Sequence, residues 1–149
     1  MITFSNSNSE IPYIKLKQKY NDALNLNQKN IEAISISSYS SESREVNSRF
    51  VNLKFIDNNN FIFFSNYNSP KSREFKEHNQ ITALLYWNTI NTQVRLKATI
   101  KKTSNEFNQT YFANRSEQKN ALAISSNQSK SIDFFEDVED SYNKSLKSD

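Results

Sequence analysis

Two apolar runs separated by a polar turn constrain the fold of this chain more than any other feature of its sequence. Val51, Leu53 and Phe55 alternate with other residues, and a second apolar run covers residues 61–64. Between them lie residues 57–60, Asp-Asn-Asn-Asn, which are typical of turns. Alternation on either side of a short polar turn indicates two antiparallel strands. The sequence therefore predicts a β-hairpin here.

A helix is expected to begin directly after this hairpin. Ser69 is a favourable N-cap residue, and Pro70 suits the first helical position. The N-terminus of a helix presents unpaired backbone N–H groups and a partial positive charge, which favour a phosphate. Lys71 adds a cation at this helix end, and Arg49 and Lys54 place two more on the preceding strand. The stretch therefore has the residues of a phosphate-binding site.

The spacing of Arg49 and Lys54 sets a condition on such a site. Residues five apart point to opposite faces of a regular strand. Both could serve one ligand only through a bulge, through a ligand at the strand end, or through a site shared between subunits. Taken alone, the pair favours two solvated strand cations, and both interpretations stay open at this point.

The composition fits one small domain without glycine. The chain has 149 residues, so we expect a single domain over residues 1–149. Only 36% of the residues are apolar, but eleven Phe and seven Tyr bury large areas at few positions. Since glycine is absent, another residue must adopt positive φ in turns, and Asn is the usual substitute. The sequence predicts this role for Asn58, Asn59, Asn60 and Asn68.

Several classes of function are disfavoured by the same composition. Cysteine is absent, which removes disulfides, zinc–thiolate sites and cysteine nucleophiles. The single histidine, His78, is explained by capping a helix C-terminus, so neither a Ser-His-Asp set nor a metal site is expected. The net charge of +3 comes from scattered cations, which argues only weakly for nucleic acid. With no signal peptide and no apolar run of spanning length, a cytoplasmic protein without membrane contact is expected.

The remaining patterns predict strands followed by helices. Strands are expected over 31–38, 81–87 and 93–102, with a polar loop over 39–47 and the hairpin from Val46. In the last strand, Val94, Leu96, Ala98 and Ile100 are expected to face inward. A helix over 12–25 carries a stripe of Tyr13, Leu16, Tyr20 and Leu24, and another covers 70–77.

The C-terminal part is expected to be helical. Thr103 and Glu106 form a capping-box pattern before a helix that carries Phe107, Tyr111 and Phe112. Ser116 would cap a second helix, and residues 125–132 would form a loop. Residues 133–149 form an acidic, divergent tail with one amphipathic helix, whereas residues 1–10 are expected to be flexible. The fold class is therefore mainly β with flanking helices.

Five motifs resemble those of the pyridoxamine 5′-phosphate oxidase family. They are Arg49 with Lys54, Phe64-Ser65-Asn66 with Ser69 and Lys71, Trp87 with Gln93-Val94-Arg95, Tyr111-Phe112 with Arg115, and Gln128-Ser129 with Ile132. They occur in the family's order and at compatible spacings over residues 30–132. The resemblance implies an FMN-binding split β-barrel, usually a homodimer with the flavin at the subunit interface.

The resemblance also implies site residues. The FMN contacts would be Arg49, Lys54, Phe64, Ser65, Lys71, Gln93, Gln128 and Ser129. The substrate phosphate would be held by Lys54, Tyr111, Arg115 and Lys119, with Tyr13 or Lys17 as a minor candidate for covering the substrate. No side chain is assigned as catalytic, because the flavin performs the chemistry. From the residues alone, a structural interpretation of each also stays open. Phe64 would be a core residue, and Gln93 would be a solvent-facing amide. Gln128 and Ser129 would belong to a polar loop, and Tyr111 would stack on Arg115 at the surface.

The sequence departs from the family pattern at several positions. Pro70 stands where Arg is usual, Lys119 replaces a Ser that holds the substrate phosphate, and Ile124 replaces a Trp. The family's C-terminal strand, which supplies a Trp and an Arg to the flavin and an Arg-Leu-His to the pyridoxal ring, has no counterpart after Arg115. The flavin half of the site is thus expected to be more complete than the substrate half.

The resemblance implies an FMN-dependent oxidase. Such an enzyme converts pyridoxamine or pyridoxine 5′-phosphate to pyridoxal 5′-phosphate, a step of pyridoxal phosphate biosynthesis, with oxygen as acceptor. One alternative is an FMN-binding protein or flavin reductase of the same fold. Another, of a different class, is a basic module that binds nucleic acid or protein; it is disfavoured because the cations coincide with the flavin motifs.

Overall fold

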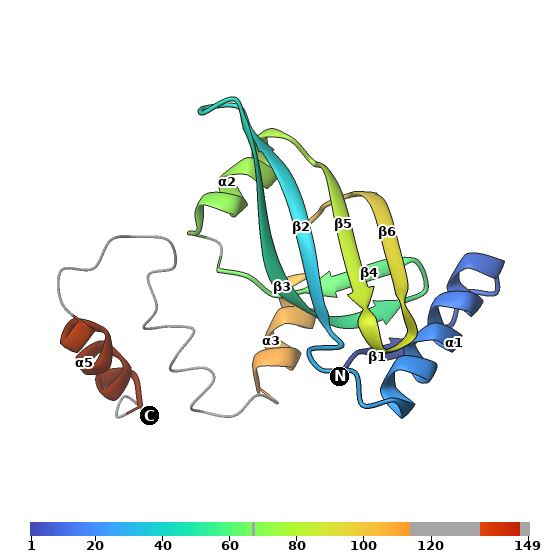
Figure 1. Ribbon diagram of the computed structural model, residues 1–149. Helices are drawn as coiled ribbons and strands as arrows, with labels where there is room; N and C mark the ends of the chain where they lie inside the picture. The colour runs from blue at the N-terminus through green and yellow to red at the C-terminus, as the bar shows by residue number, and fades with distance from the viewer. Residues whose placement is uncertain (67, 114–134, 147–149) are drawn as a thin grey trace. The chain divides into compact units, whose positions relative to one another are not determined.

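The computed structural model describes residues 1–66, 68–113 and 135–146 (Figure 1). The chain divides into two compact units. The first contains Met1–Ser65 and Glu74–Ile100, and the second contains Asn66–Arg73 and Lys101–Asp149.

The first unit is a β-sheet with one long helix. Its strands are β1 (Thr3–Ser5), β2 (Ala33–Ser40), β3 (Glu45–Asp57), β4 (Asn60–Phe63), β5 (Gln80–Trp87) and β6 (Thr92–Thr99). They follow the order β1-β3-β2-β5-β6, and β4 also pairs with β3. Only the β1–β3 pair is parallel. Helix α1 (Ile11–Asn25), the 3-10 turn η1 (Asn88–Ile90) and the last residues of helix α2 (Pro70–Glu77) also belong to this unit.

Strand β3 pairs with β2 along its first segment and with β4 along its last segment. Its first residues, up to Asn52, pair with β2, and residues from Leu53 onward pair with β4. The predicted hairpin is therefore confirmed, with Asp57 opposite Asn60. In Figure 1 the end of β3, together with β1 and β4, lies across the direction of β2, β5 and β6. The change of direction allows one strand to bound the core on two sides.

The hydrophobic core lies between this sheet and α1. The largest fully buried apolar side chains are those of Trp87, Ile36, Leu53 and Leu85. From α1, the residues that enter the core are Leu16, Tyr20 and Ala23. The predicted stripe is thus correct for Leu16 and Tyr20 but wrong for Leu24, which is exposed. Ala23 is buried instead, since a methyl group fits where the helix approaches the sheet closely.

Asparagine replaces glycine at the left-handed backbone positions. Among the described residues, positive φ occurs at Asn6, Asn27, Asn30, Arg44, Asn58 and Asn91. The prediction is confirmed for Asn58, at 55°, in the β3–β4 turn. It is wrong for Asn59 and Asn60, because a single left-handed residue suffices to reverse the chain at this turn, and it is also wrong for Asn68, which lies before α2. Short polar side chains tolerate this region better than other non-glycine residues.

Replacing Asn58 by Ala is expected to lower the free energy of unfolding by about 1 kcal/mol, because Ala is penalised at positive φ. Urea denaturation measures this effect. Asn58→Gly is the matched control, since it loses the same 2.7 Å hydrogen bond from Asn8 but adopts positive φ freely. Equal losses for both variants would show that the side-chain contact, rather than the backbone, decides stability here.

Several predicted boundaries are shifted by pairing along the sheet. The expected loop over 39–47 is shorter, because Tyr39 pairs with Val46 and Ser40 with Glu45. The last strand ends at Thr99 rather than at residue 102. Ala98 is exposed, contrary to prediction, because β6 is an edge strand and its end is not covered.

The described part of the second unit contains helices. Helix α3 (Asn105–Ala113) begins as predicted, but the backbone N–H of Phe107 donates to Ser104 Oγ at 3.2 Å. Ser104, not Thr103, is therefore the cap. Helix α5 (Phe135–Leu146) agrees with the helix predicted in the tail. The predicted helix after Ser116 and the loop over 125–132 lie outside the described residues.

Helix α2 (Pro70–Glu77) begins in the second unit and ends in the first. Its predicted bounds are confirmed. Before it, the hydroxyl groups of Ser69 and Ser72 both donate to the carbonyl oxygen of Asn66, at 2.7 and 2.9 Å. None of the described helices has the length and apolar character needed to cross a membrane.

Candidate functional site

Arg49 lies at the polar end of the inner face of the sheet. Its Nη2 donates to Glu74 Oε2 at 2.8 Å, which forms an ion pair. Its Nη1 donates to Ser38 Oγ and, at 3.4 Å, to the carbonyl oxygen of Ile36. The side chain is 23% exposed, so it is not fully enclosed by these contacts. Arg49 is therefore held to β2 and α2 while it still reaches solvent.

Glu74 is a buried carboxylate that collects hydrogen bonds from two strands. It is only 6% exposed and accepts from Ser38 on β2 and from Arg49 and Asn47 on β3. Burial raises the pKa of Glu74, but the hydrogen bonds and the Arg49 charge outweigh burial, so the pKa lies below its ordinary value. Glu74 is thus ionised at neutral pH.

Lys54 occupies an irregularity of β3. The pairing with β4 shifts between Leu53 and Phe55, which indicates a β-bulge at Lys54. Before the bulge, the odd-numbered residues up to Leu53 are the more buried ones, whereas after it Ile56 is buried. The bulge therefore changes which residues face inward. A bulge was one of the three ways in which Arg49 and Lys54 could serve one ligand, and the strand contains it.

Gln93 faces the other side of the sheet. One row of directly paired residues runs across four strands through Arg49, Ile36, Ala83 and Leu96. Paired residues share a face, and Gln93 lies three residues before Leu96 on β6, so it points to the opposite face. Gln93 is exposed there. Within one chain, Arg49 and Gln93 are therefore not brought together.

Phe64 and Ser65 directly follow β4. The ring of Phe64 lies 6.4 Å from that of Phe55 in an edge-to-face arrangement. The Ser65 hydroxyl is buried and has no hydrogen-bond partner among the described residues. Buried polar atoms are nearly always paired, so an unpaired hydroxyl calls for a ligand or water. The unpaired Ser65 hydroxyl thus has the capacity to bond a polar group of a ligand, as the predicted flavin contact requires.

The other predicted site residues lie either in the second unit or outside the described residues. Lys71 lies in the first turn of α2 and Tyr111 lies in α3, both in the second unit. The remaining predicted contacts lie outside the described residues; they are Arg115, Lys119, Gln128 and Ser129.

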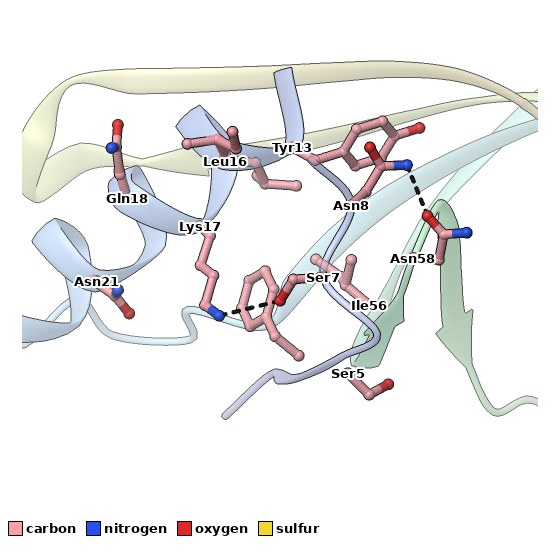
Figure 2. A pocket seen from close by; sticks show the side chains of 12 residues that line it. Ser5, Ser7, Asn8, Tyr13, Leu16, Lys17, Gln18, Asn21, Ile56 and Asn58 are labelled. Atoms are coloured by element: carbon pink, nitrogen blue, oxygen red, sulfur yellow. Dashed lines mark hydrogen bonds between the residues drawn. The ribbon is translucent and has the colours of Figure 1, made fainter. Parts of the chain in front are cut away.

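A pocket of about 210 Å³ lies between α1, the N-terminal segment and the end of β3 (Figure 2). Figure 2 shows Tyr13 and Lys17 on its wall, and Lys17 Nζ lies 3.4 Å from Ser7 Oγ. None of the predicted FMN contacts lines it. The pocket is thus separate from the residues that the motifs single out.

Sequence reasoning missed Glu74, Ser38 and Asn47. Their grouping depends on pairing between β2 and β3 and on the docking of α2, which are not local in sequence. One signal was available. Phe75 is the only large apolar residue of α2, and its ring lies 6.3 Å from that of Phe63, so it marks the face that packs on the strands. The acidic residue next to Phe75 is therefore a candidate for a buried, paired carboxylate.

Known proteins with similar sequences identify the family. The family described as "Pyridoxamine 5'-phosphate oxidase" matches residues 17–138. This chain belongs to that family. The predicted resemblance to this family of FMN-dependent, oxidoreductase-like proteins is therefore confirmed.

Curated relatives carry the same description. "Pyridoxine/pyridoxamine 5'-phosphate oxidase" of Colwellia psychrerythraea is 35% identical over 109 residues, covering 73% of this chain and 50% of the relative. The protein of the same name from Legionella pneumophila (strain Lens) is 34% identical over 133 residues, covering 89% of this chain and 61% of the relative. The chain therefore spans less than two thirds of the length of these relatives.

Solved structures confirm the fold. PhzG from Burkholderia lata 383, solved in complex with tetrahydrophenazine-1-carboxylic acid, superposes with a TM-score of 0.84 at 23% identity, covering 94% of this chain and 67% of PhzG. A pyridoxamine 5'-phosphate oxidase-related, FMN binding protein from Nostoc punctiforme has a TM-score of 0.69 at 10% identity, covering 88% and 72%. The predicted FMN-binding split β-barrel, mainly β with flanking helices, is therefore correct.

Proposed function

We propose that this chain binds FMN and oxidises pyridoxamine or pyridoxine 5′-phosphate to pyridoxal 5′-phosphate, with oxygen as acceptor. The observation that carries the proposal is the family match over residues 17–138, joined to the buried, unpaired Ser65 hydroxyl in a family motif. Bound FMN would supply the redox chemistry, with a hydride equivalent passing from the substrate carbon that carries the amine or hydroxyl to oxygen as peroxide; for the amine substrate, water would then release ammonia and leave the aldehyde.

The residues of this chain would bind and orient the FMN and the substrate. Arg49 and Lys71 would hold the FMN phosphate, Lys54 would lie near both phosphates, and Ser65 would contact the flavin with Phe64 beside it. Gln93 would approach the flavin ring, and Gln128 and Ser129 would complete the contacts. Tyr111, Arg115 and Lys119 would hold the substrate phosphate.

A homodimer forms part of this proposal. Arg49 and Gln93 point to opposite faces of one sheet, so a single flavin that contacts both would have to lie between two copies of the chain. In a two-fold dimer, the outer face of one copy can lie against the Arg49 side of the other. Sedimentation with and without FMN would measure the number of copies.

The experiment starts from the purified full chain loaded with FMN. We expect a yellow protein that releases FMN on denaturation and that forms pyridoxal 5′-phosphate and peroxide from pyridoxamine 5′-phosphate in air. A yellow protein that forms no product would exclude this oxidase activity. Lys119, which stands where the family has Ser, favours a second candidate, a flavin protein or reductase with another substrate. Reduction of its flavin by a nicotinamide cofactor would support that candidate.

Replacing Ser65 by Ala is expected to act in opposite directions on the free and the bound protein. The free energy of unfolding without flavin should stay the same or rise by up to about 1 kcal/mol, because an unsatisfied buried hydroxyl is removed. FMN affinity should fall about three- to tenfold, because one hydrogen bond to the ligand is lost. Urea denaturation and flavin-fluorescence titration measure the two effects.

Ser43→Ala is the control for this variant. Ser43 is exposed in the turn between β2 and β3, where only its backbone N–H is bonded to Ser40 in the described contacts, so loss of its hydroxyl should change neither quantity appreciably. A Ser65→Ala variant that binds FMN as tightly as the unaltered chain would remove Ser65 from the site.

A further inference from the structure

We infer that Glu74 is a positioning residue that presents Arg49 to the FMN phosphate. The inference rests on the proposed function, and it adds a residue that none of the flavin motifs contains. Glu74 would not touch the flavin. Its carboxylate would fix the orientation of the guanidinium, and the guanidinium would hold the phosphate.

The hydrogen bonds of Arg49 leave a defined part of the guanidinium available. Three of its N–H groups are used, by Glu74, by Ser38 and by the carbonyl oxygen of Ile36. A guanidinium has five N–H groups, so two remain among the described contacts, one on Nε and one on Nη2. Two such donors on one edge match two oxygens of a phosphate. Arg49 is thus held by one edge and can present the other.

Glu74 is well placed to fix this orientation because it is itself fixed. Its Oε2 accepts from Ser38 as well as from Arg49, and its Oε1 accepts from Asn47 at 3.0 Å. The carboxylate is buried, so the strength of these contacts is little reduced by solvent. Both carboxylate oxygens therefore have partners, and the Arg49 head can rotate only if several bonds break together.

A carboxylate beside a phosphate ligand also has a cost. Its negative charge opposes the charge of the phosphate, and it partly neutralises Arg49. The orientation that Glu74 gives to Arg49 therefore favours FMN binding, whereas the negative charge of Glu74 opposes it. Variants that change one and keep the other separate the two effects.

The test is the affinity of flavin-free protein for FMN and for riboflavin, which lacks the phosphate. Fluorescence titration gives both dissociation constants, and their ratio reports the phosphate contact alone. In Glu74→Ala, where Arg49 loses its anchor, we expect the preference for FMN to fall about tenfold. In Glu74→Gln, the amide oxygen still accepts from Arg49 and Ser38, and Asn47 can turn its own amide oxygen toward the new NH₂ group. This variant should keep the preference to within about threefold.

Several outcomes decide the inference. An unchanged preference in Glu74→Ala, with only a lower melting temperature, would make Glu74 a structural brace and overturn the proposal. A higher preference would show that the carboxylate competes with the phosphate, and it would overturn the proposal as well. If Glu74→Ala does not fold, Ser38→Ala replaces it; a fall of about threefold supports the proposal and no fall contradicts it. An unaltered chain that does not prefer FMN to riboflavin overturns the proposed function itself, and the role of Glu74 with it.

Discussion

Replacing Arg49 by Met is expected to lower the free energy of unfolding of the flavin-free protein by about 3 kcal/mol at pH 7. The loss follows from the ion pair with Glu74, whose carboxylate is only 6% exposed. Without the guanidinium, that carboxylate stays buried and ionised with hydrogen bonds from Ser38 and Asn47 alone. Urea denaturation at 25 °C measures the difference.

The effect of Arg49→Met should depend on pH in a defined direction. The folded-state pKa of Glu74 lies below its ordinary value of 4.5, so the ionised carboxylate stabilises the fold above that pH. This stabilisation is lost as the pH falls through the lower, folded-state pKa. Protonated Glu74 no longer needs the guanidinium. The destabilisation caused by Arg49→Met should therefore be full at pH 7 and shrink below about pH 4.5.

Two controls accompany this variant. Arg44→Met removes an exposed arginine from the turn between β2 and β3 and should change the free energy of unfolding by less than about 0.5 kcal/mol. Arg49→Met combined with Glu74→Gln should recover part of the loss, because the buried charge is then gone. A loss of the same size for Arg49→Met at pH 3.5 and pH 7 would contradict the explanation from ionic pairing.

Replacing Trp87 by Ala is expected to lower the free energy of unfolding by about 4 kcal/mol. The side chain is 1% exposed, and its ring lies 6.0 Å from that of Tyr20, so truncation leaves a cavity between β5 and α1. Its Nε1–H also donates to the carbonyl oxygen of Ile31 at 2.9 Å. Since Trp87 is the only tryptophan, circular dichroism rather than its fluorescence must follow the transition.

The neighbouring residue gives the matched control for Trp87. Tyr86 belongs to the same strand but is 57% exposed, so Tyr86→Ala should cost less than about 1 kcal/mol. Trp87→Phe separates packing from hydrogen bonding, with an expected loss of about 1–2 kcal/mol. Equal losses for Tyr86→Ala and Trp87→Ala would contradict the assignment of Trp87 to the centre of the core.

Local signals predicted the elements that surround the candidate site. Alternation across the turn at Asn58 predicted the hairpin, and Ser69-Pro70 predicted the start of α2, because both depend on neighbouring residues. The family motifs added the split barrel, which periodicity alone did not reach. The bulge at Lys54 was recognised as one of three ways to satisfy the spacing to Arg49, but residue pattern could not choose among them.

Features that depend on residues far apart in the chain could not be predicted from local sequence patterns. The partner of Arg49 lies 25 residues away on a helix, and only the docking of that helix brings the two together. Ala98 follows the apolar alternation of β6, but its exposure depends on which strand forms the edge. Ser104 rather than Thr103 caps α3. Both residues carry a hydroxyl group that can cap a helix, and a shift of one residue in the helix start determines which one does so.

The opposite orientation of Arg49 and Gln93 on one sheet has a genetic consequence if two copies share each flavin. A subunit altered only at Arg49 and another altered only at Gln93 would each be defective in pure form. Combined in a single pair, they would leave one intact cofactor site built from the undamaged side of each. Two recessive alleles of this kind would complement one another, whereas two alleles that damage the same side would not.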